Sequence, residues 1–184
     1  MRVLIATSSF ARFPGDPTAA HGNALYDLAT ELGRHLEGTL ITHAGPDAPA
    51  TEQLGGLTVI RVQPQRPEAA LHKALVGPEA PRVIRSARAM RRAVVAAAPD
   101  HDVAHGFWFF PGGWSVSRLA MPRVMTLPGP DIHVFPRYPV VGGLIRRTVG
   151  MMDACVAVDT LGRDIMADMG AKRLEYIPSP IKLD

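Results

Sequence analysis

Residues that could bind a polar ligand gather in segments that directly follow short apolar runs. These runs end at Ala6, His105, Leu127 and Val158. The segments after them hold hydrogen-bonding side chains, glycines and aromatic rings, a mixture that suits recognition of a sugar or a phosphate. If the runs are parallel strands, a ligand binds beyond their carboxyl ends, so these segments are the candidate site.

The first segment, TSSFARFPGDPTAA, is long for a connection inside a compact domain, and long loops tend to be functional or mobile. His21, Gly22 and Asn23 follow it and open a predicted helix. Free backbone N–H groups at a helix start favour an anion such as phosphate. The alternative is that Gly22 only lets the chain turn. No GxGxxG pattern is present, so binding of NAD or FAD is not supported.

The second segment begins at His105, and the aromatic residues Phe107, Trp108, Phe109 and Phe110 follow. Aromatic rings this close to a strand end form either a packed loop or a platform for a sugar or lipid acceptor. His105 is either part of that site or a structural histidine whose ring nitrogens are satisfied inside the protein.

The third segment, after Thr126, turns outward through Gly129 and reaches Asp131 and His133. The Asp131 carboxylate could accept hydrogen bonds from sugar hydroxyls. Alternatively, it holds the loop by accepting hydrogen bonds from nearby backbone N–H groups. The sequence leaves both roles open.

The composition is that of a folded globular domain. Of 184 residues, 47% are hydrophobic and 20% charged, and the net charge of +3 comes without the basic blocks of a nucleic-acid binder. The single cysteine, Cys155, is expected in the core, and the histidines lack metal-ligand spacing. The apolar runs are too short for a signal peptide or a membrane span. We therefore expect a cytoplasmic protein, with contact at the inner face of a membrane left open.

Strands and helices must alternate along the chain to place the segments on one edge. Apolar runs predict strands at Arg2 to Ala6, Thr39 to His43, Leu57 to Val62, Asp102 to His105, Arg123 to Leu127, Asp153 to Val158 and Leu174 to Ile177. Helices are predicted from Leu25 to about Gly38, and at Arg82 to Ala98, Pro111 to Ala120, Val140 to Met151 and Thr160 to Met169. Alternation of this kind predicts an α/β, Rossmann-like three-layer domain with a mainly parallel sheet. We expect this domain at residues 1–178, with a linker starting at 179–184.

The helix predicted from Arg82 carries arginines on one side. Arg82, Arg85, Arg88, Arg91 and Arg92 are expected opposite Val83, Ile84, Ala87, Met90 and Val94. Such a side could contact anionic lipid headgroups. A solvated surface with two or three ion pairs is the preferred interpretation.

Four segments, in order, resemble the N-terminal domain of family 4 glycosyltransferases. They are the stretch from Thr7 into the first helix, DVAHGFWFFPGG, PRVMTLPGPD, and DACVAVDTLGRDIMADMGAKRLEYIPSPIKLD. The resemblance implies a GT-B architecture and a retaining transfer of sugar from a nucleotide-sugar to a sugar or lipid-linked acceptor, without a metal or other cofactor. It also implies that the donor is held mainly by a C-terminal domain that these residues do not include.

The resemblance assigns roles to the candidate residues. Asp131 and His105 would be catalytic, and His21, Gly22 and Asn23 would face the donor phosphates. Phe107, Trp108, Thr126, Gly129 and His133 would contact substrate. One departure is Pro128, which stands where the family has a histidine and offers no donor. Alternatives are a non-catalytic sugar- or lipid-binding module, an epimerase-like GT-B protein, and a flavodoxin-like nucleotide binder.

Overall fold

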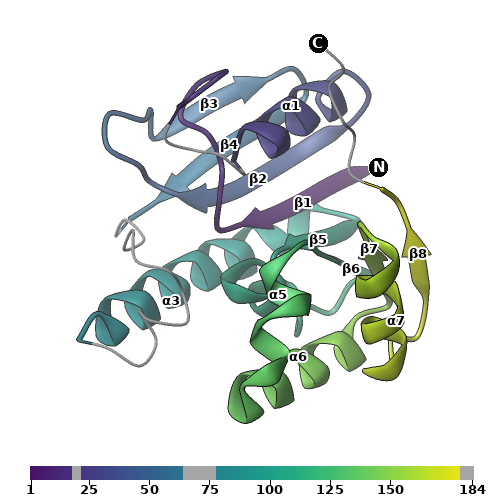
Figure 1. Cartoon of the computed structure of the whole chain (residues 1–184). Helices are drawn as coiled ribbons and strands as arrows, with labels where there is room; N and C mark the ends of the chain where they lie inside the picture. The colour runs from purple at the N-terminus through teal and green to yellow at the C-terminus, as the bar shows by residue number, and fades with distance from the viewer. Residues whose placement is uncertain (18–21, 64–77, 179–184) are drawn as a thin grey trace.

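A single eight-stranded sheet organises the chain in the computed structural model, which describes residues 1–17, 22–63 and 78–178 (Figure 1). The strand order is β3-β4-β2-β1-β5-β6-β7-β8, and every neighbouring pair is parallel except β3 and β4. The strands are β1 (Arg2–Thr7), β2 (Glu37–His43), β3 (Thr51–Leu54), β4 (Leu57–Val62), β5 (Val103–Phe107), β6 (Arg123–Leu127), β7 (Ala154–Ala157) and β8 (Leu174–Tyr176). The predicted Rossmann-like α/β fold with a mainly parallel sheet is confirmed.

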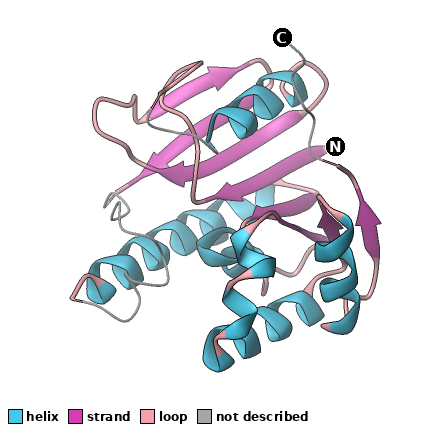
Figure 2. Cartoon of the chain, in the orientation of Figure 1, coloured by secondary structure: helices cyan, strands magenta, loops and turns pink. Residues whose placement is uncertain are grey.

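Helices cover the two faces of the sheet unequally (Figure 2). They are α1 (Gly22–Leu32), α3 (Ala80–Ala97), α4 (Trp114–Val116), α5 (Pro130–His133), α6 (Pro139–Met151) and α7 (Thr160–Asp168), with short helical turns at Ala98–Asp100, Phe109–Gly113 and Phe135–Arg137. Successive strand residues point to opposite faces. On β1, Val3 and Ile5 pack in one cluster with Ala29 of α1, whereas Leu4 and Ala6 join the larger cluster on the other face.

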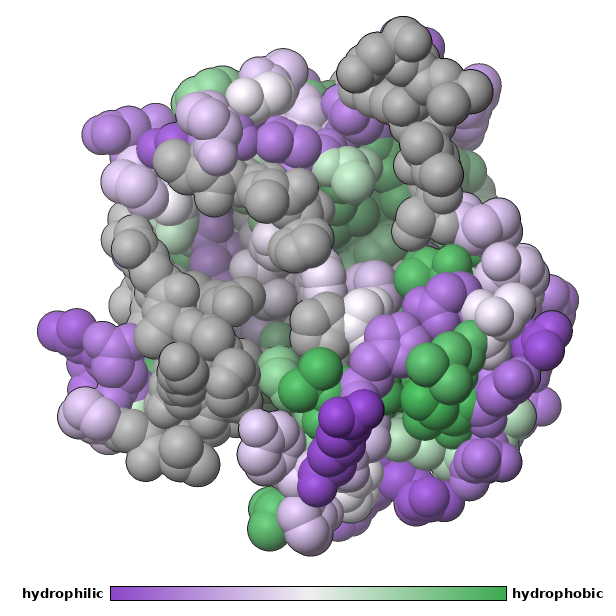
Figure 3. Space-filling model, viewed as in Figure 1, coloured by the Kyte–Doolittle hydropathy of each residue, from purple (hydrophilic) through white to green (hydrophobic). Residues whose placement is uncertain are grey.

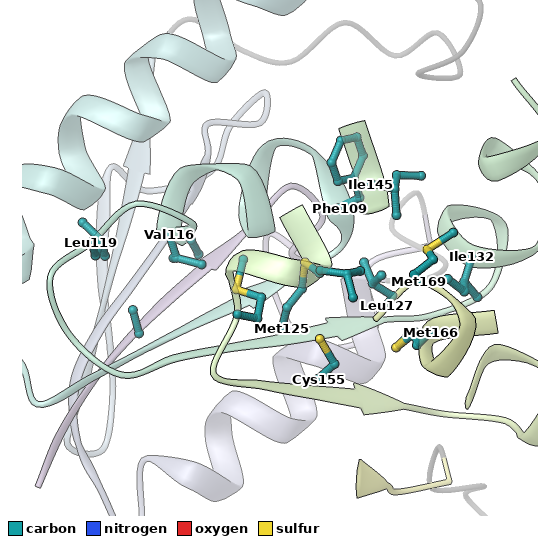
Figure 4. Packing of buried hydrophobic residues seen from close by; sticks show 14 of the residues in the cluster. Phe109, Val116, Leu119, Met125, Leu127, Ile132, Ile145, Cys155, Met166 and Met169 are labelled. Atoms are coloured by element: carbon teal, nitrogen blue, oxygen red, sulfur yellow. The ribbon is translucent and has the colours of Figure 1, made fainter. Parts of the chain in front are cut away.

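The larger cluster receives its helical side chains from α3 to α7. Figure 4 shows Met125 and Leu127 of β6 and Cys155 of β7 in one cluster with Ile145 of α6 and Met166 of α7. All five are fully or almost fully buried. The expectation that Cys155 lies in the core is confirmed.

The α1 face of β5 and β6 is only partly covered. Ile5 is in register with His105, so His105 lies on the face that packs against α1. Phe107 lies on that same face, two residues further along β5. His105, Phe107 and Val124 remain partly exposed, because α1 packs over β1, β2 and β4 instead. Part of the carboxyl half of β5 is therefore accessible from this side.

Two predictions near the first helix are wrong. The helix was expected to continue to about Gly38, but α1 ends at Leu32 and β2 already begins at Glu37. A Cβ atom at Gly33 would lie 1.8 Å from the carbonyl oxygen of Leu54, so the chain turns there to pass closely under the β3–β4 hairpin. The edge strand β3 lies where no strand was predicted, and none of its four residues is buried.

The helix predicted from Pro111 to Ala120 is also wrong. The structure has a wide helical turn at Phe109–Gly113 and only three residues of α4. A Cβ atom at Gly112 would lie 2.1 Å from the carbonyl oxygen of Phe107 and 2.6 Å from that of Ala6. The backbone therefore packs directly against β5 and β1, a contact that a regular helix with side chains would prevent.

Other elements differ in smaller ways. α3 begins at Ala80 instead of Arg82, and α5 and the turn at Phe135–Arg137 lie where no helix was expected. Predicted strand ends agree with the structure to within about two residues, the usual uncertainty of such boundaries. None of the helices among the described residues is long and apolar enough to cross a membrane.

Candidate ligand-binding site at the carboxyl edge of the sheet

The four predicted segments leave four consecutive strands of the sheet, β1, β5, β6 and β7. Thr7 of β1 is in register with Phe107 of β5, and Phe107 is in register with Thr126 of β6. The loops that follow these strands therefore start side by side at one edge. This is the edge where parallel sheets bind their ligands.

His105 and Thr126 are directly hydrogen-bonded. The Nε2 atom of His105 lies 2.8 Å from Oγ1 of Thr126, and the imidazole stacks on the ring of Phe107 with centroids 4.3 Å apart. Burial lowers the pKa of His105 to about 4. The ring is therefore neutral at pH 7 and offers one N–H donor and one acceptor, not a positive charge.

Asp131 holds the loop that follows β5. Its carboxylate accepts a hydrogen bond from the backbone N–H of Phe109, and its side chain is buried. The sequence left open whether Asp131 binds sugar hydroxyls or holds a loop through backbone N–H groups, and this contact is of the second kind. Asp131 therefore connects the β6 segment to the β5 segment.

Trp108, between β5 and the wide helical turn, has an unusual backbone conformation. Its φ of 66° and ψ of 152° belong to a region that is almost confined to glycine. The conformation is held by two hydrogen bonds, in which Trp108 N–H donates to the Thr126 carbonyl at 3.0 Å and Gly113 N–H donates to the Trp108 carbonyl at 2.8 Å. Strain of this kind is concentrated at functional sites, so it supports the choice of this segment.

The β6 segment is also tied to the segment after β7. Gly129 has a φ of 55°, and its carbonyl accepts hydrogen bonds from Ile132 and His133 N–H at 3.1 Å each, which starts α5. His133 Nε2 lies 3.0 Å from Oδ2 of Asp159, the residue that caps α7. Hydrogen bonding from Gly162 N–H, and then from His133, lowers the pKa of Asp159. The predicted substrate contact His133 thus joins two loops.

The first segment is held by internal hydrogen bonds. Asn23 Nδ2 donates to the carbonyl of Asp16 at 2.8 Å, and Arg12 donates to both carboxylate oxygens of Asp16 at 2.7 and 2.8 Å. The hydrogen bond from Arg12 to the carboxylate, together with its charge, raises the pKa of Arg12. Gly22 is buried at the start of α1, whereas His21 lies outside the described residues.

Arg61 of β4 also holds the first segment, through contacts with Ala11 and Phe10. Its side chain is 1% exposed, and Nη2 donates to Glu52 at 2.7 Å and to the carbonyl of Ala11 at 3.2 Å. Its guanidinium carbon also lies 5.7 Å from the ring centre of Phe10. Sequence reasoning missed this residue, although one signal was available. Arg61 occupies the inward position of β4 that follows Leu57 and Val59.

Glu52 extends this anchor to α1. Tyr26 of α1 donates its hydroxyl hydrogen to Oε1 of Glu52 at 2.5 Å. Burial, and then the hydrogen bond to Glu52, raise the pKa of Tyr26 to about 12. The Arg61–Glu52–Tyr26 network therefore connects β4, the β3 edge strand and the helix that follows the first segment.

Apolar side chains lie on the surface next to the β6 segment. In the space-filling view, green hydrophobic patches alternate with purple hydrophilic residues over α5, α6 and α7 (Figure 3). Exposed residues there are Val134, Tyr138, Val140, Leu144 and Leu161. Among the described residues, no group of three or more histidine, cysteine or acidic side chains could hold a metal ion.

Comparison with known proteins identifies the fold. No protein-family model and no curated protein sequence matches the chain. Among solved structures, sucrose-phosphate synthase from Thermosynechococcus elongatus aligns at 12% identity with a TM-score of 0.64, covering 97% of this chain and 48% of that one. Trehalose-6-phosphate synthase OtsA aligns at 14% identity and a TM-score of 0.62, covering 98% and 50%.

A third similar structure is Anabaena HepE in complex with UDP-glucose. It aligns at 12% identity with a TM-score of 0.52, covering 98% of this chain and 44% of that one. The chain thus spans about half the length of these three proteins. At such low identities the likeness shows the fold alone. The chain has the fold of a GT-B glycosyltransferase domain.

Proposed function

We propose that this chain is the acceptor-side domain of a retaining glycosyltransferase that uses a nucleotide-sugar donor. The observation that carries the proposal is the convergence of the β1, β5 and β6 loops at one edge of a GT-B-type sheet. HepE, which shares the fold, was solved in complex with UDP-glucose. The donor would be held mainly by a second domain, outside these 184 residues.

The accessible residues at the edge fit an acceptor sugar or lipid-linked sugar. The neutral imidazole of His105 can donate or accept a hydrogen bond to a hydroxyl group without bringing a charge. Phe107 and Trp108 supply aromatic surface, which suits the apolar face of a sugar ring. His105 is therefore our candidate for the side chain that orients the acceptor hydroxyl.

Asp131 acts differently in this proposal. Its carboxylate bonds the backbone of Phe109, so it is a positioning residue that fixes the strained Trp108 turn. Gly22 and Asn23, at the start of α1, face the donor phosphates, where free backbone N–H groups stabilise negative charge. Thr126, Gly129 and His133 shape the acceptor side.

The test is sugar transfer by the complete gene product, measured as release of UDP from UDP-glucose in the presence of candidate acceptors. His105→Ala should lower kcat/KM by about tenfold to a hundredfold, the loss expected for one hydrogen bond to a reacting group. His35→Ala is the matched control, since His35 is exposed in the turn between α1 and β2, away from this edge. Proton NMR of the product would show whether the anomeric configuration is retained.

Asp131→Ala should also lower turnover, and it should change the tryptophan fluorescence, because Trp108 and Trp114 both flank the released turn. Equal kinetics of wild type, His105→Ala and Asp131→Ala would refute the site. A gene product that binds acceptor but never releases UDP would support the non-catalytic binding module instead. Pro128 favours that second candidate, because a proline offers no hydrogen-bond donor where the family has a histidine.

A further inference from the structure

The outer surface of α3 carries an unbalanced positive charge. The helix contains Arg82, Arg85, Arg88, Arg91 and Arg92 and no acidic residue. Four of these are exposed, and none of the five makes an ion pair with a residue that the structure describes. The arginines are therefore solvated as predicted from sequence, but the two or three predicted ion pairs are not found among the described residues.

Branched aliphatic side chains lie among these arginines. Ile84 is 42% exposed and Val95 is 50% exposed. The prediction that Ile84 lies on the buried side is wrong, because that side is formed by Val83, Met90 and Val94. The spacing from Ile84 through Arg88 and Arg91 to Val95 places the four residues in one stripe along the helix.

The surface along this stripe is hollowed in two places that share Arg88 and Arg92. One hollow has a volume of 480 Å³, and its lining includes Pro81, Ile84 and Arg85. The other has a volume of 380 Å³, and its lining includes Arg91, Val95 and Ala96. Both hollows are open to solvent. A lipid could therefore reach the guanidinium groups with its headgroup and the aliphatic side chains with its acyl chains.

The helix is fixed in this orientation by its other side. Val83, Met90 and Val94 are buried at 0 to 3% exposure, and the latter two belong to the larger core cluster. Arg91 lies over the ring of Trp114 with its guanidinium carbon 4.7 Å from the ring centre. The arginine side therefore needs no rearrangement to face a partner.

We propose that this surface of α3 binds bilayers that contain anionic phospholipids. A helix of 18 residues presents a face about 27 Å long, enough for several headgroups. Arginines interleaved with aliphatic residues characterise helices that lie in the plane of a membrane interface. Protein interfaces and single-stranded nucleic-acid sites are enriched in exposed aromatic residues, and the exposed side of α3 has none.

The test is co-sedimentation of the 184-residue chain with vesicles of phosphatidylcholine, with or without about 30% phosphatidylglycerol, at low and high salt. Binding should require the anionic lipid and weaken as salt rises. The variant R85Q/R88Q/R92Q should bind about a hundredfold more weakly, since each arginine near an anionic surface contributes about a fivefold gain. I84S/V95S should weaken binding further at high salt, where the charges are screened.

The matched control is R34Q/R163Q/R173Q, which removes the same charge from exposed positions elsewhere on the surface. It should bind like the wild type, and unchanged far-UV circular dichroism should show that both triple variants are folded. The proposal is overturned if neutral and anionic vesicles sediment the chain equally, or if neither does. Equal weakening by the two triple variants would also overturn it, because net charge and not α3 would then be responsible. None of these readouts depends on sugar transfer.

Discussion

Replacing Arg61 with methionine should destabilise the protein by about 3–5 kcal/mol, the cost of breaking a buried ion pair from one side. The Arg61 side chain is 1% exposed and that of Glu52 is 18% exposed. Loss of the guanidinium leaves a largely buried carboxylate without its counter-charge. It also removes the hydrogen bond to the carbonyl of Ala11, in the first loop of the candidate site.

The control is Arg123→Met. Arg123 pairs with Asp153, whose side chain is 45% exposed, so that loss should cost only about 0–1 kcal/mol. A double variant, Arg61→Met with Glu52→Gln, should recover about 1–2 kcal/mol. Its glutamine carries no charge and still presents an oxygen to the Tyr26 hydroxyl.

Urea unfolding followed by circular dichroism measures these free energies of unfolding, and hydrogen exchange adds a local readout. The backbone N–H of Ala11, which donates to the Gly22 carbonyl, should exchange faster in Arg61→Met. The reasoning fails if Arg61→Met costs no more than Arg123→Met. It also fails if Ala11 exchange is unchanged, because Arg61 would then not hold the loop.

Three further predictions concern single positions. Burial lowers the pKa of His105 from 6.5 to about 4, so on acidification the unfolded state binds a proton before the folded state does. The free energy of unfolding should therefore fall by up to roughly 3 kcal/mol as the pH drops from about 6.5 to 4. Urea titrations at each pH should show that His105→Gln lacks this component. Gly112→Ala should prevent stable folding, since its Cβ would overlap two carbonyl oxygens. The control is Gly143→Ala on α6, whose Cβ would meet no atom within 4 Å; thermal melts should show that it stabilises the protein by about 0.5–1 kcal/mol. Cys155 is buried and its pKa is raised to about 11, so Ellman's reagent should label it only after unfolding, and rapid labelling of the native protein would contradict the core placement.

The mainly parallel sheet, though not its strand order, was predictable from sequence because its central strands are apolar runs of strand length. Ile5, Met125 and Cys155 are buried residues of such runs, and runs of this kind are visible in the sequence without knowledge of their partners. β3 was not predictable, because an edge strand of polar residues has no buried side to leave a pattern. The turn at Gly112 was missed because its cause is a close approach to two other strands.

The candidate site was predictable in its location but not in its contacts. His105 and Thr126 end adjacent apolar runs, so their proximity follows from parallel pairing. The bond from Asp131 to Phe109 and the ion pair between Arg61 and Glu52 depend on the register of whole elements, which no local pattern encodes. For that reason Asp131 and Arg61, which hold the loops in place, were harder to interpret from sequence than His105 and Thr126, which lie at the strand ends.

The strand order has a consequence for self-association. The sheet ends on one side in β3, which has four residues and exposes Thr51 and Gln53, and on the other in β8, which has three residues. Short edge strands of this kind offer few unpaired amide groups to another chain, which limits growth of the sheet into aggregates. A partner of this domain should therefore attach through side chains on its helices and loops, and not by adding a strand.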